Sequence, residues 1–194
     1  MNNFILKEYL DEHFSTVVFA DIVDHFIQKF GVNVSNEDDL YLFKYNQISA
    51  NWNEEITHNC RGIILRHTEN GWKYVAIPFK KFFNLEEGKC KYFDENVFSE
   101  NAEFIKYSEK IDGSCVQVWY DDVKNTWRAS TLGSISTAGV FDHPFTFAEL
   151  FWKIFGEKNT AKLVKGYTYI FELWSKYNQV VTQYETERIV LLGI

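Results

Sequence analysis

The sequence contains little proline and glycine, few cysteines and no long apolar run. Of its 194 residues, 2 are proline and 10 are glycine. No segment rich in proline, glycine and serine divides the chain and no internal repeat is present, so we expect one domain with a sizeable core. The start, MNNFILKEYLDEHF, carries acids where a signal peptide would carry a basic segment and an apolar centre. These absences predict a soluble, intracellular protein without a membrane partner.

The cysteines and histidines are too scattered for a disulfide framework or a zinc site. Cys60, Cys90 and Cys115 form no Cys-x-x-Cys pair, and the 5 histidines show no His-Glu-x-x-His or other ligand spacing. We expect reduced thiols and ordinary histidines, and no metal-ligating residue can be identified from the sequence.

Basic residues are outnumbered by acidic ones, 20 against 27, which gives a formal net charge of −7. A broad basic surface for nucleic acid is therefore excluded, because phosphate contacts need clustered lysine and arginine. A local basic cleft remains compatible with this balance. The chain is 46% hydrophobic and 18% aromatic, which excludes a disordered protein and predicts a globular one.

Hydrophobic spacing predicts a helical N-terminal lead-in over residues 1–38. Apolar residues recur at helical intervals from Val18 to Phe30, and Gly31 follows as a C-terminal stop. An acidic loop at residues 35–39 then separates this lead-in from a domain over residues 39–194.

From Leu40 onward, alternating apolar and polar residues predict mainly strands. Asn70-Gly71 is a strong hairpin signal, and Lys124-Asn125 marks a further turn. Pro144 is predicted in the first turn of an amphipathic helix whose apolar face carries Phe147, Leu150, Phe151, Ile154 and Phe155. Antiparallel strands with few helices define an α+β fold. The predicted strands cover residues 40–48, 61–67, 72–78, 106–110, 114–120, 126–132, 167–174, 178–184 and 187–194.

The stretch EKIDGSCVQVWYDD places Lys110 directly before a turn signal. Taken alone, residues 111–114 are explained most simply as a hairpin turn, because Asp-Gly accepts a positive φ and serine can bond the nearby backbone. Lys110 would then be an exposed strand end. The pattern Lys-x-Asp-Gly is also the signature of nucleotidyl-transfer enzymes whose lysine amine attacks a nucleoside triphosphate. Such an amine must be neutral, which calls for neighbouring positive charge or desolvation.

Five sequence blocks around this lysine occur in a fixed order: LFKYN (42–46), NCRGIIL (59–65), KKFFNLEE (80–87), EKIDGS (109–114) and FELWSKYNQVV (171–181). ERIVLLGI closes the chain. With these blocks, the sequence from about Leu42 to Ile194 resembles the ATP-dependent RNA ligase 1 family, the phage-type RNA-repair ligases of the covalent nucleotidyltransferase superfamily. The resemblance implies a nucleotidyltransferase domain with ATP-grasp-like antiparallel sheets, in the cytoplasm of a bacterium or a virus-infected host cell.

The resemblance implies that Lys110 is the catalytic nucleophile. Its amine would attack the α-phosphate of ATP and release pyrophosphate, AMP would pass to the 5′-phosphate of RNA, and a 3′-hydroxyl would displace it. The implied cofactors are ATP and Mg²⁺ or Mn²⁺, whose charge neutralises phosphate oxygens. The implied partners are RNA ends, such as those of cleaved transfer RNA.

Three upstream residues are implied to bind the nucleotide. Arg61 would contact its phosphates with a planar, always-charged fork, although it could also be an edge residue with a solvated head. Lys81 would bring an ammonium group near phosphate, and Phe83 a ring to the adenosine pocket. The alternative explanation of Phe83 is a strand residue that alternates between core and surface.

Three further nucleotide-binding residues are implied in the lysine block and downstream of it. Asp112 would orient the lysine, and Gly113 would let the backbone approach the nucleotide. Glu172 would accept hydrogen bonds from the ribose, where the alternative is a carboxylate on a solvated strand face.

The sequence departs from the family at several positions. Leu132 stands where a basic residue precedes Gly-Ser, with Arg128 as the nearest cation, and Gln179 stands where an arginine is common. The family's later Glu-Gly and Lys-x-Lys motifs do not occur. We therefore expect an incomplete C-terminus, with a second polypeptide supplying the missing phosphate-binding lysines.

Two alternatives to an RNA ligase stay open. The Lys-x-Asp-Gly motif is shared with DNA ligases and GTP-using capping enzymes. The LFKYN and KFFN blocks argue against these two classes. The missing motifs also suit a non-catalytic fragment that only binds nucleotide or RNA.

Overall fold

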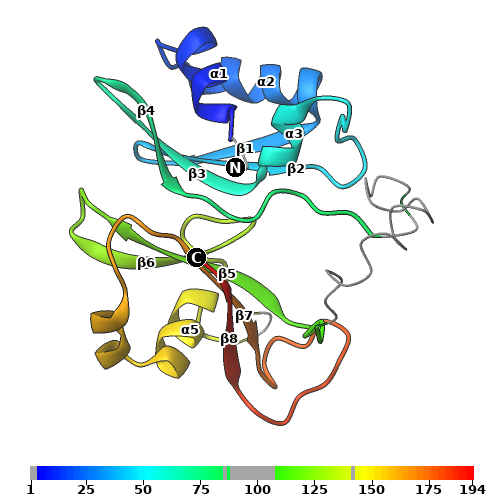
Figure 1. Cartoon of the computed structure of the whole chain (residues 1–194), viewed down its shortest axis with the longest axis vertical. Coiled ribbons are helices and arrows are strands. Elements are labelled where there is room, and N and C mark those ends of the chain that lie inside the picture. The colour runs from blue at the N-terminus through cyan, green and yellow to red at the C-terminus, as the bar shows by residue number, and fades with distance from the viewer. Residues whose placement is uncertain (1–3, 85–86, 88–107, 141–142) are drawn as a thin grey trace, which may run out of the picture.

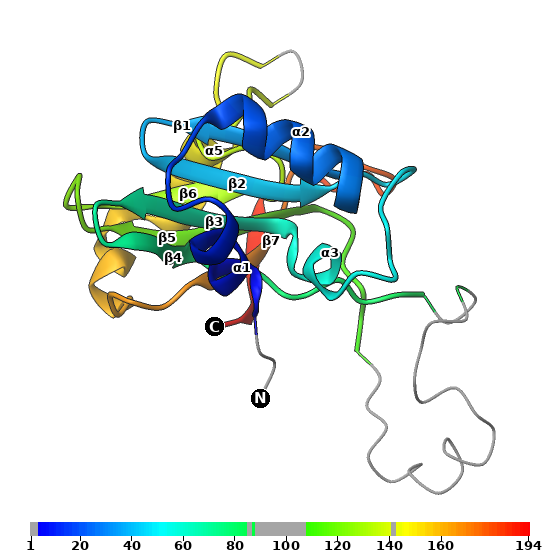
Figure 2. The same ribbon diagram turned by 90° about the horizontal axis from the view of Figure 1, so that it is seen from above.

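The computed structural model describes residues 4–84, 87, 108–140 and 143–194. In this part of the chain, two four-stranded antiparallel sheets have the strand orders β1-β2-β3-β4 and β6-β5-β7-β8. The sheets face each other, and helices cover their outer sides (Figures 1 and 2). This architecture confirms the predicted α+β class. The strands are β1 (Val32–Glu37), β2 (Leu40–Tyr45), β3 (Arg61–Thr68), β4 (Gly71–Ala76), β5 (Ser114–Asp121), β6 (Thr126–Thr131), β7 (Tyr169–Trp174) and β8 (Arg188–Gly193), and the helices are α1 (Leu6–His13), α2 (Phe19–Phe30), α3 (Glu55–Asn59), α5 (Phe147–Phe155) and the 3₁₀ helix η3 (Glu157–Lys162).

The N-terminal helices pack on the outer side of the first sheet. α2 ends as predicted, because Gly31 adopts a left-handed φ of 62° and caps the last turn. Ile22, Phe26 and Phe30 form its buried face and join side chains of α1, β2 and β3 in one core cluster. No helix among the described residues combines the length and the apolar character that crossing a membrane requires.

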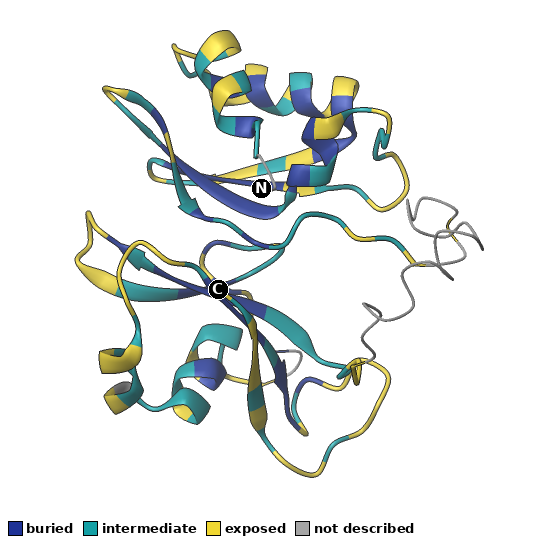
Figure 3. Cartoon of the chain, in the orientation of Figure 1, coloured by how far each residue is buried: buried dark blue, intermediate teal, exposed yellow. Residues whose placement is uncertain are grey.

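β2 is covered on both faces, which explains its nearly unbroken apolar sequence. Successive side chains of a strand point to opposite faces. Tyr41 and Phe43 therefore pack in the core cluster of the helices, whereas Leu40 and Leu42 form a second cluster with Trp119 of β5. Figure 3 shows buried residues in the strands of both sheets and on parts of the helices that cover them.

The second sheet carries α5 on its outer side. Thr146 caps this helix, since its Oγ1 accepts the Glu149 N–H at 3.2 Å and the Glu149 carboxylate accepts the Thr146 N–H at 2.6 Å. The predicted position of Pro144 in the first turn is wrong, because this capping box starts the helix after Thr146. Leu150 and Phe151 then pack against β5 and β7.

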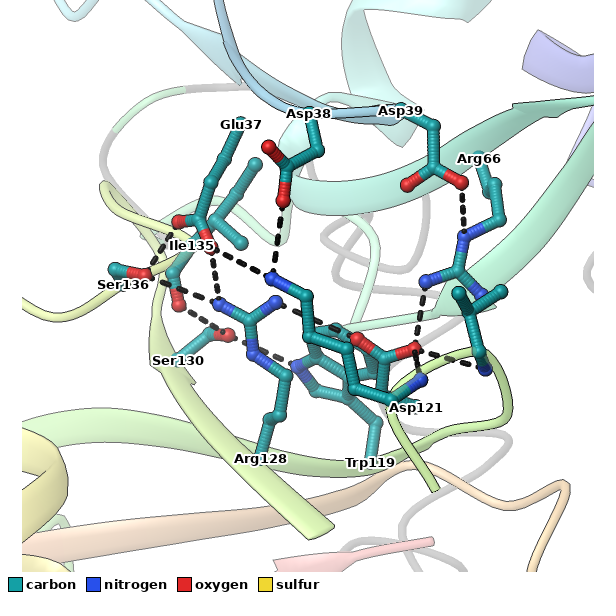
Figure 4. A network of polar contacts seen from close by, with 12 residues as sticks. Glu37, Asp38, Asp39, Arg66, Trp119, Asp121, Arg128, Ser130, Ile135 and Ser136 are labelled. Carbon is teal, nitrogen blue, oxygen red and sulfur yellow. Dashed lines mark hydrogen bonds and ion pairs between the residues drawn. The ribbon is translucent and has the colours of Figure 1, made fainter. Parts of the chain in front are cut away.

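A network of ion pairs joins the two sheets (Figure 4). Arg66 of β3, whose side chain is 3% exposed, donates from Nη2 to Oδ1 of the fully buried Asp121 of β5 at 2.7 Å. Arg66 Nε lies 2.9 Å from Asp39 Oδ2, an ion pair without hydrogen-bond alignment. Arg128 of β6 adds a hydrogen bond from its Nη2 to Glu37 Oε1 at 2.7 Å. The network fixes the β1-β2 hairpin against the second sheet.

The predicted strand boundaries differ from the structure in three places. β1 pairs with β2, although its residues were assigned to the helical lead-in and the acidic loop. Residues 178–184, predicted as a strand, bend without pairing in a sheet, and Val181 is 80% exposed. Of the predicted strand 106–110, residues 108–110 are not in a strand and the others lie outside the described residues, as does Cys90. The remaining predicted strands match the structure within a few residues at each end.

Candidate nucleotide-binding cleft

A cleft of about 480 Å³ opens at the beginning of β5. Its volume lies within the range of small-molecule sites, which is roughly 300–1,000 Å³. Four of the predicted site residues line it together, namely Arg61, Lys110, Gly113 and Glu172. Arg61 lies in β3, Lys110 and Gly113 lie in the segment before β5, and Glu172 lies in β7. The fold therefore gathers residues that are up to 111 positions apart in the sequence.

Strand pairing fixes the position of Glu172, which is one of two glutamates among the described residues that line this cleft. β5 and β7 are antiparallel, with Cys115 directly opposite Glu172. Directly opposite residues share one face of a sheet, and both side chains line the cleft together with Arg61 of β3 in the first sheet. Burial, with a smaller contribution from the charge of Glu172, raises the pKa of the Cys115 thiol to about 11. Cys115 is therefore an unreactive thiol that lines the cleft, rather than a nucleophile.

Glu172 is held in a setting that penalises its charge. Burial raises the pKa of its carboxyl group, and the nearby positive charges of Lys110 and Arg61 and the Gly113 N–H oppose that rise only in part. A desolvated carboxylate of this kind needs polar partners, which the open cleft leaves room for.

Gly113 is required by a close approach of two backbones. A Cβ at this position would lie 2.4 Å from the Leu173 carbonyl oxygen and 3.3 Å from Cγ of Glu172. Its φ is not positive, so the predicted Asp-Gly turn with a left-handed glycine is wrong. The glycine instead lets the end of the lysine block lie directly against β7.

Asp112 does not line the cleft and secures a neighbouring loop. Its Oδ2 accepts the backbone N–H of Thr182 at 2.6 Å and of Val181 at 2.8 Å. These two hydrogen bonds, with Thr182 the larger contributor, lower the pKa of the Asp112 carboxyl group. The Asp112 N–H donates to Oη of Tyr184 at 3.3 Å. The structure thus links Asp112 to the segment that follows β7, and its predicted role toward the lysine stays a prediction.

Lys81 and Phe83 do not line the cleft. Phe83 packs edge-on against Trp52 and His58, with ring centroids 5.3 and 5.5 Å away. Lys81 Nζ lies 4.5 Å from the Phe83 ring centroid and 3.8 Å from a Glu87 carboxylate oxygen. Their roles at the nucleotide remain predictions that this placement does not support.

Phe82 is the aromatic residue of this segment that lines the cleft. Its ring is 59% exposed and stacks with Arg61, whose guanidinium carbon lies 4.4 Å from the ring centroid. Sequence alternation indicates that one of two adjacent phenylalanines is core, without indicating which. Phe82 was missed for that reason.

A model of the family described as RNA ligase matches residues 59–194 of this chain. The chain belongs to this RNA ligase family. It is 34% identical to the RNA ligase of Rhodothermus phage RM378 over 214 residues, which cover 96% of this chain and 48% of the phage protein. It is also 28% identical over 194 residues to a protein of Autographa californica nuclear polyhedrosis virus, whose provisional name is bifunctional polynucleotide kinase/RNA ligase. That match covers 90% of this chain and 27% of the viral protein.

The departures from the RNA ligase family can now be located. Arg128, the cation nearest to Leu132 in sequence, is engaged by Glu37 and by Asp121, which lies 3.4 Å away. Leu132 itself lies against β3, since a Cβ at Gly62 would be 2.6 Å from its Cα. Arg128 is therefore occupied by ion pairs that join the two sheets. The close approach of the Leu132 backbone to Gly62 of β3 is a second contact between the sheets.

Proposed function

We propose that this chain is the adenylyl-accepting part of an ATP-dependent RNA ligase, with Lys110 as the nucleophile. The observation that carries the proposal is the convergence of Lys110, Arg61, Gly113 and Glu172 on one cleft. Membership of the RNA ligase family supports it. The chain spans about half of the phage relative's length, so sealing of RNA ends is proposed for the complete ligase.

In the proposed first step, Nζ of Lys110 attacks the α-phosphorus of ATP in its neutral form. A nitrogen–phosphorus bond forms, the bond from the α-phosphorus to the bridging oxygen breaks, and pyrophosphate leaves. The amine loses its proton to solvent or to a basic group. Arg61, which has no carboxylate within ion-pair distance among the described residues, can bind the phosphate oxygens. Glu172 can accept hydrogen bonds from the ribose hydroxyls.

In the later steps, a 5′-phosphate oxygen of RNA attacks the same phosphorus and Lys110 leaves as the amine. A 3′-hydroxyl then attacks the activated 5′-phosphate, and AMP leaves. Each step is an in-line displacement, so the residues of the cleft contribute mainly by positioning and by electrostatic stabilisation.

The described residues fit a divalent cation that arrives with the nucleotide. No group of three or more His, Cys, Asp or Glu side chains in the described part could hold a metal by itself. Mg²⁺ is commonly bound by one or two carboxylates together with substrate phosphates, and Glu172 is a carboxylate that lines the cleft. When bound, the ion would neutralise phosphate charge during the displacement.

The proposal is tested by incubating the chain with Mg²⁺ and ATP labelled at the α-phosphate, followed by denaturing electrophoresis. We expect label on the wild-type protein and none on Lys110→Ala. Labelling that requires GTP would favour a capping-type enzyme. Nucleotide binding without labelling would favour a non-catalytic fragment.

A further inference from the structure

A second hollow of about 280 Å³ lies beside the cleft, at the ends of β5 and β6 near the start of α5. Cys115 lines both the hollow and the cleft. Lys44, Ser114 and Thr131 supply polar side chains to the hollow. Lys44 reaches it from β2 of the first sheet, and a Cβ at Gly133 would lie 3.1 Å from its Nζ.

The polar groups of the hollow are donors with unused capacity. Ser114 Oγ accepts the Asn178 Nδ2–H at 3.2 Å, and Thr131 Oγ1 accepts the Gly133 N–H at 3.3 Å. Neither hydroxyl donates to an acceptor within the described part of the chain. No aspartate or glutamate of the described part of the chain lines the hollow. An ammonium and two hydroxyl donors without a carboxylate suit an anion with several acceptor oxygens.

Lys44 and two neighbouring cations have no ion pair in the described part of this acidic protein. Among the residues that the structure describes, neither Lys44 nor Arg61 nor Lys110 has an Asp or Glu oxygen within ion-pair distance. Lys44 is the β-ladder partner of Arg61. Three cations without an ion pair in the described part of the chain therefore border the cleft and the adjoining hollow, and Lys44 lies on the side of the hollow, away from the carboxylates of Glu109 and Glu172 that line the cleft.

We infer that Lys44, with the hydroxyls of Ser114 and Thr131, binds a phosphate group of the RNA substrate next to the site of lysine adenylylation. The inference rests on the proposed function and adds a substrate-positioning residue to it. The phosphate is either the 5′-terminal one or one inside the strand. Both present anionic non-bridging oxygens to the hollow, and only the terminal phosphate is lost when the RNA carries a 5′-hydroxyl.

The test is the binding of short RNAs with a 5′-phosphate or a 5′-hydroxyl, measured by fluorescence anisotropy with the whole chain. We expect Lys44→Ala to weaken binding about tenfold and to lower the slope of log Kd against log salt by about one, as for loss of one phosphate contact. A loss confined to the 5′-phosphorylated RNA identifies the terminal phosphate, and an equal loss with both RNAs identifies an internal one.

Two variants keep this test specific. Lys44→Arg preserves the charge and should retain most of the affinity. Lys158→Ala removes one exposed lysine from η3 and should leave Kd unchanged. Unaltered affinity and salt slope in Lys44→Ala overturn the inference, as does a wild-type chain that binds neither RNA. Label on Lys110 in the same preparation shows that the proposed function stands regardless of this outcome.

Discussion

At the scale of single residues, the cleft combines groups that the fold alone would not favour. Glu172 is partly buried, and desolvation disfavours its ionised form. A neutral side chain of the same shape would give a more favourable free energy of folding. A carboxylate that is retained against such a penalty is expected where a ligand, rather than the core, needs it.

Glu172→Gln should therefore stabilise the fold while it weakens nucleotide binding. Because the pKa of Glu172 is raised in the folded state, its contribution to stability is greatest below the ordinary glutamate pKa and is lost as the pH rises through the folded pKa. We expect the melting temperature of the variant to exceed that of wild type by about 2 °C at neutral pH, with the difference vanishing in acid. ATP affinity, measured by calorimetry, should fall at least about tenfold. A variant that is less stable at every pH would mean that Glu172 is structural.

At the scale of secondary-structure elements, the decisive feature is the approach of residues 112–114 to β7. The register Ser114↔Leu173 brings the lysine block against the strand that carries Glu172. The hydrogen bonds from the N–H groups of Val181 and Thr182 to Asp112 attach the loop after β7 to the same block. These contacts hold β5, β7 and the loop after β7 together.

Gly113→Ala should disturb this junction. The added Cβ would lie 2.4 Å from a backbone oxygen, which cannot move as a flexible side chain would. We expect a loss of about 2 kcal/mol in unfolding free energy, seen as a melting temperature about 6 °C lower. The matched control is Gly139→Ala, because nothing lies within 4 Å of a Cβ there. Equal melting temperatures for the two variants would contradict the close approach.

Sequence patterns predicted the elements that are governed by local chemistry. Gly31 ends α2 and Asn70-Gly71 joins β3 to β4 because turn and cap residues act over a few positions. Residues 178–184 were mispredicted because their backbone bonds to the distant Asp112 carboxylate instead of to a strand. Such a tertiary contact leaves no periodic trace in the sequence.

The site was predictable to the extent that it lies in the family's blocks. Arg61, Lys110, Gly113 and Glu172 were named from those blocks, and the fold brings them together. The exposure of Phe82 and the arrival of Lys44 beside Gly133 depend on how the two sheets meet. Single-strand alternation carries no information about that packing.

At the scale of the whole molecule, the ion-pair network joins the two sheets at the end of β5, whereas the cleft opens at the beginning of that strand. Burial alone would raise the pKa of Asp121, but Arg66 and the N–H groups of Lys124 and Val123 outweigh it and lower the pKa. The network's contribution is therefore present above the ordinary aspartate pKa and is lost as the pH falls through the lowered one.

Arg66→Leu should destabilise the protein strongly at neutral pH, because it leaves the fully buried Asp121 without its main partner. We expect a loss of about 3 kcal/mol in the free energy of unfolding by urea, and a smaller loss in acid, where the Asp121 that lacks Arg66 takes up a proton. Lys124→Met, which removes the exposed pair with Asp38, should cost less than about 1 kcal/mol. Similar losses for the two variants would argue against a buried network that joins the sheets.

The central claim is that the cleft directs adenylylation to Lys110. The most direct measurement is peptide mapping by mass spectrometry after the chain has been incubated with Mg²⁺ and ATP. We predict AMP on the peptide that contains Lys110, and none on the other lysine-containing peptides or on the Lys110→Ala protein. A folded chain that binds ATP yet carries no AMP, or carries it on another lysine, would contradict the account.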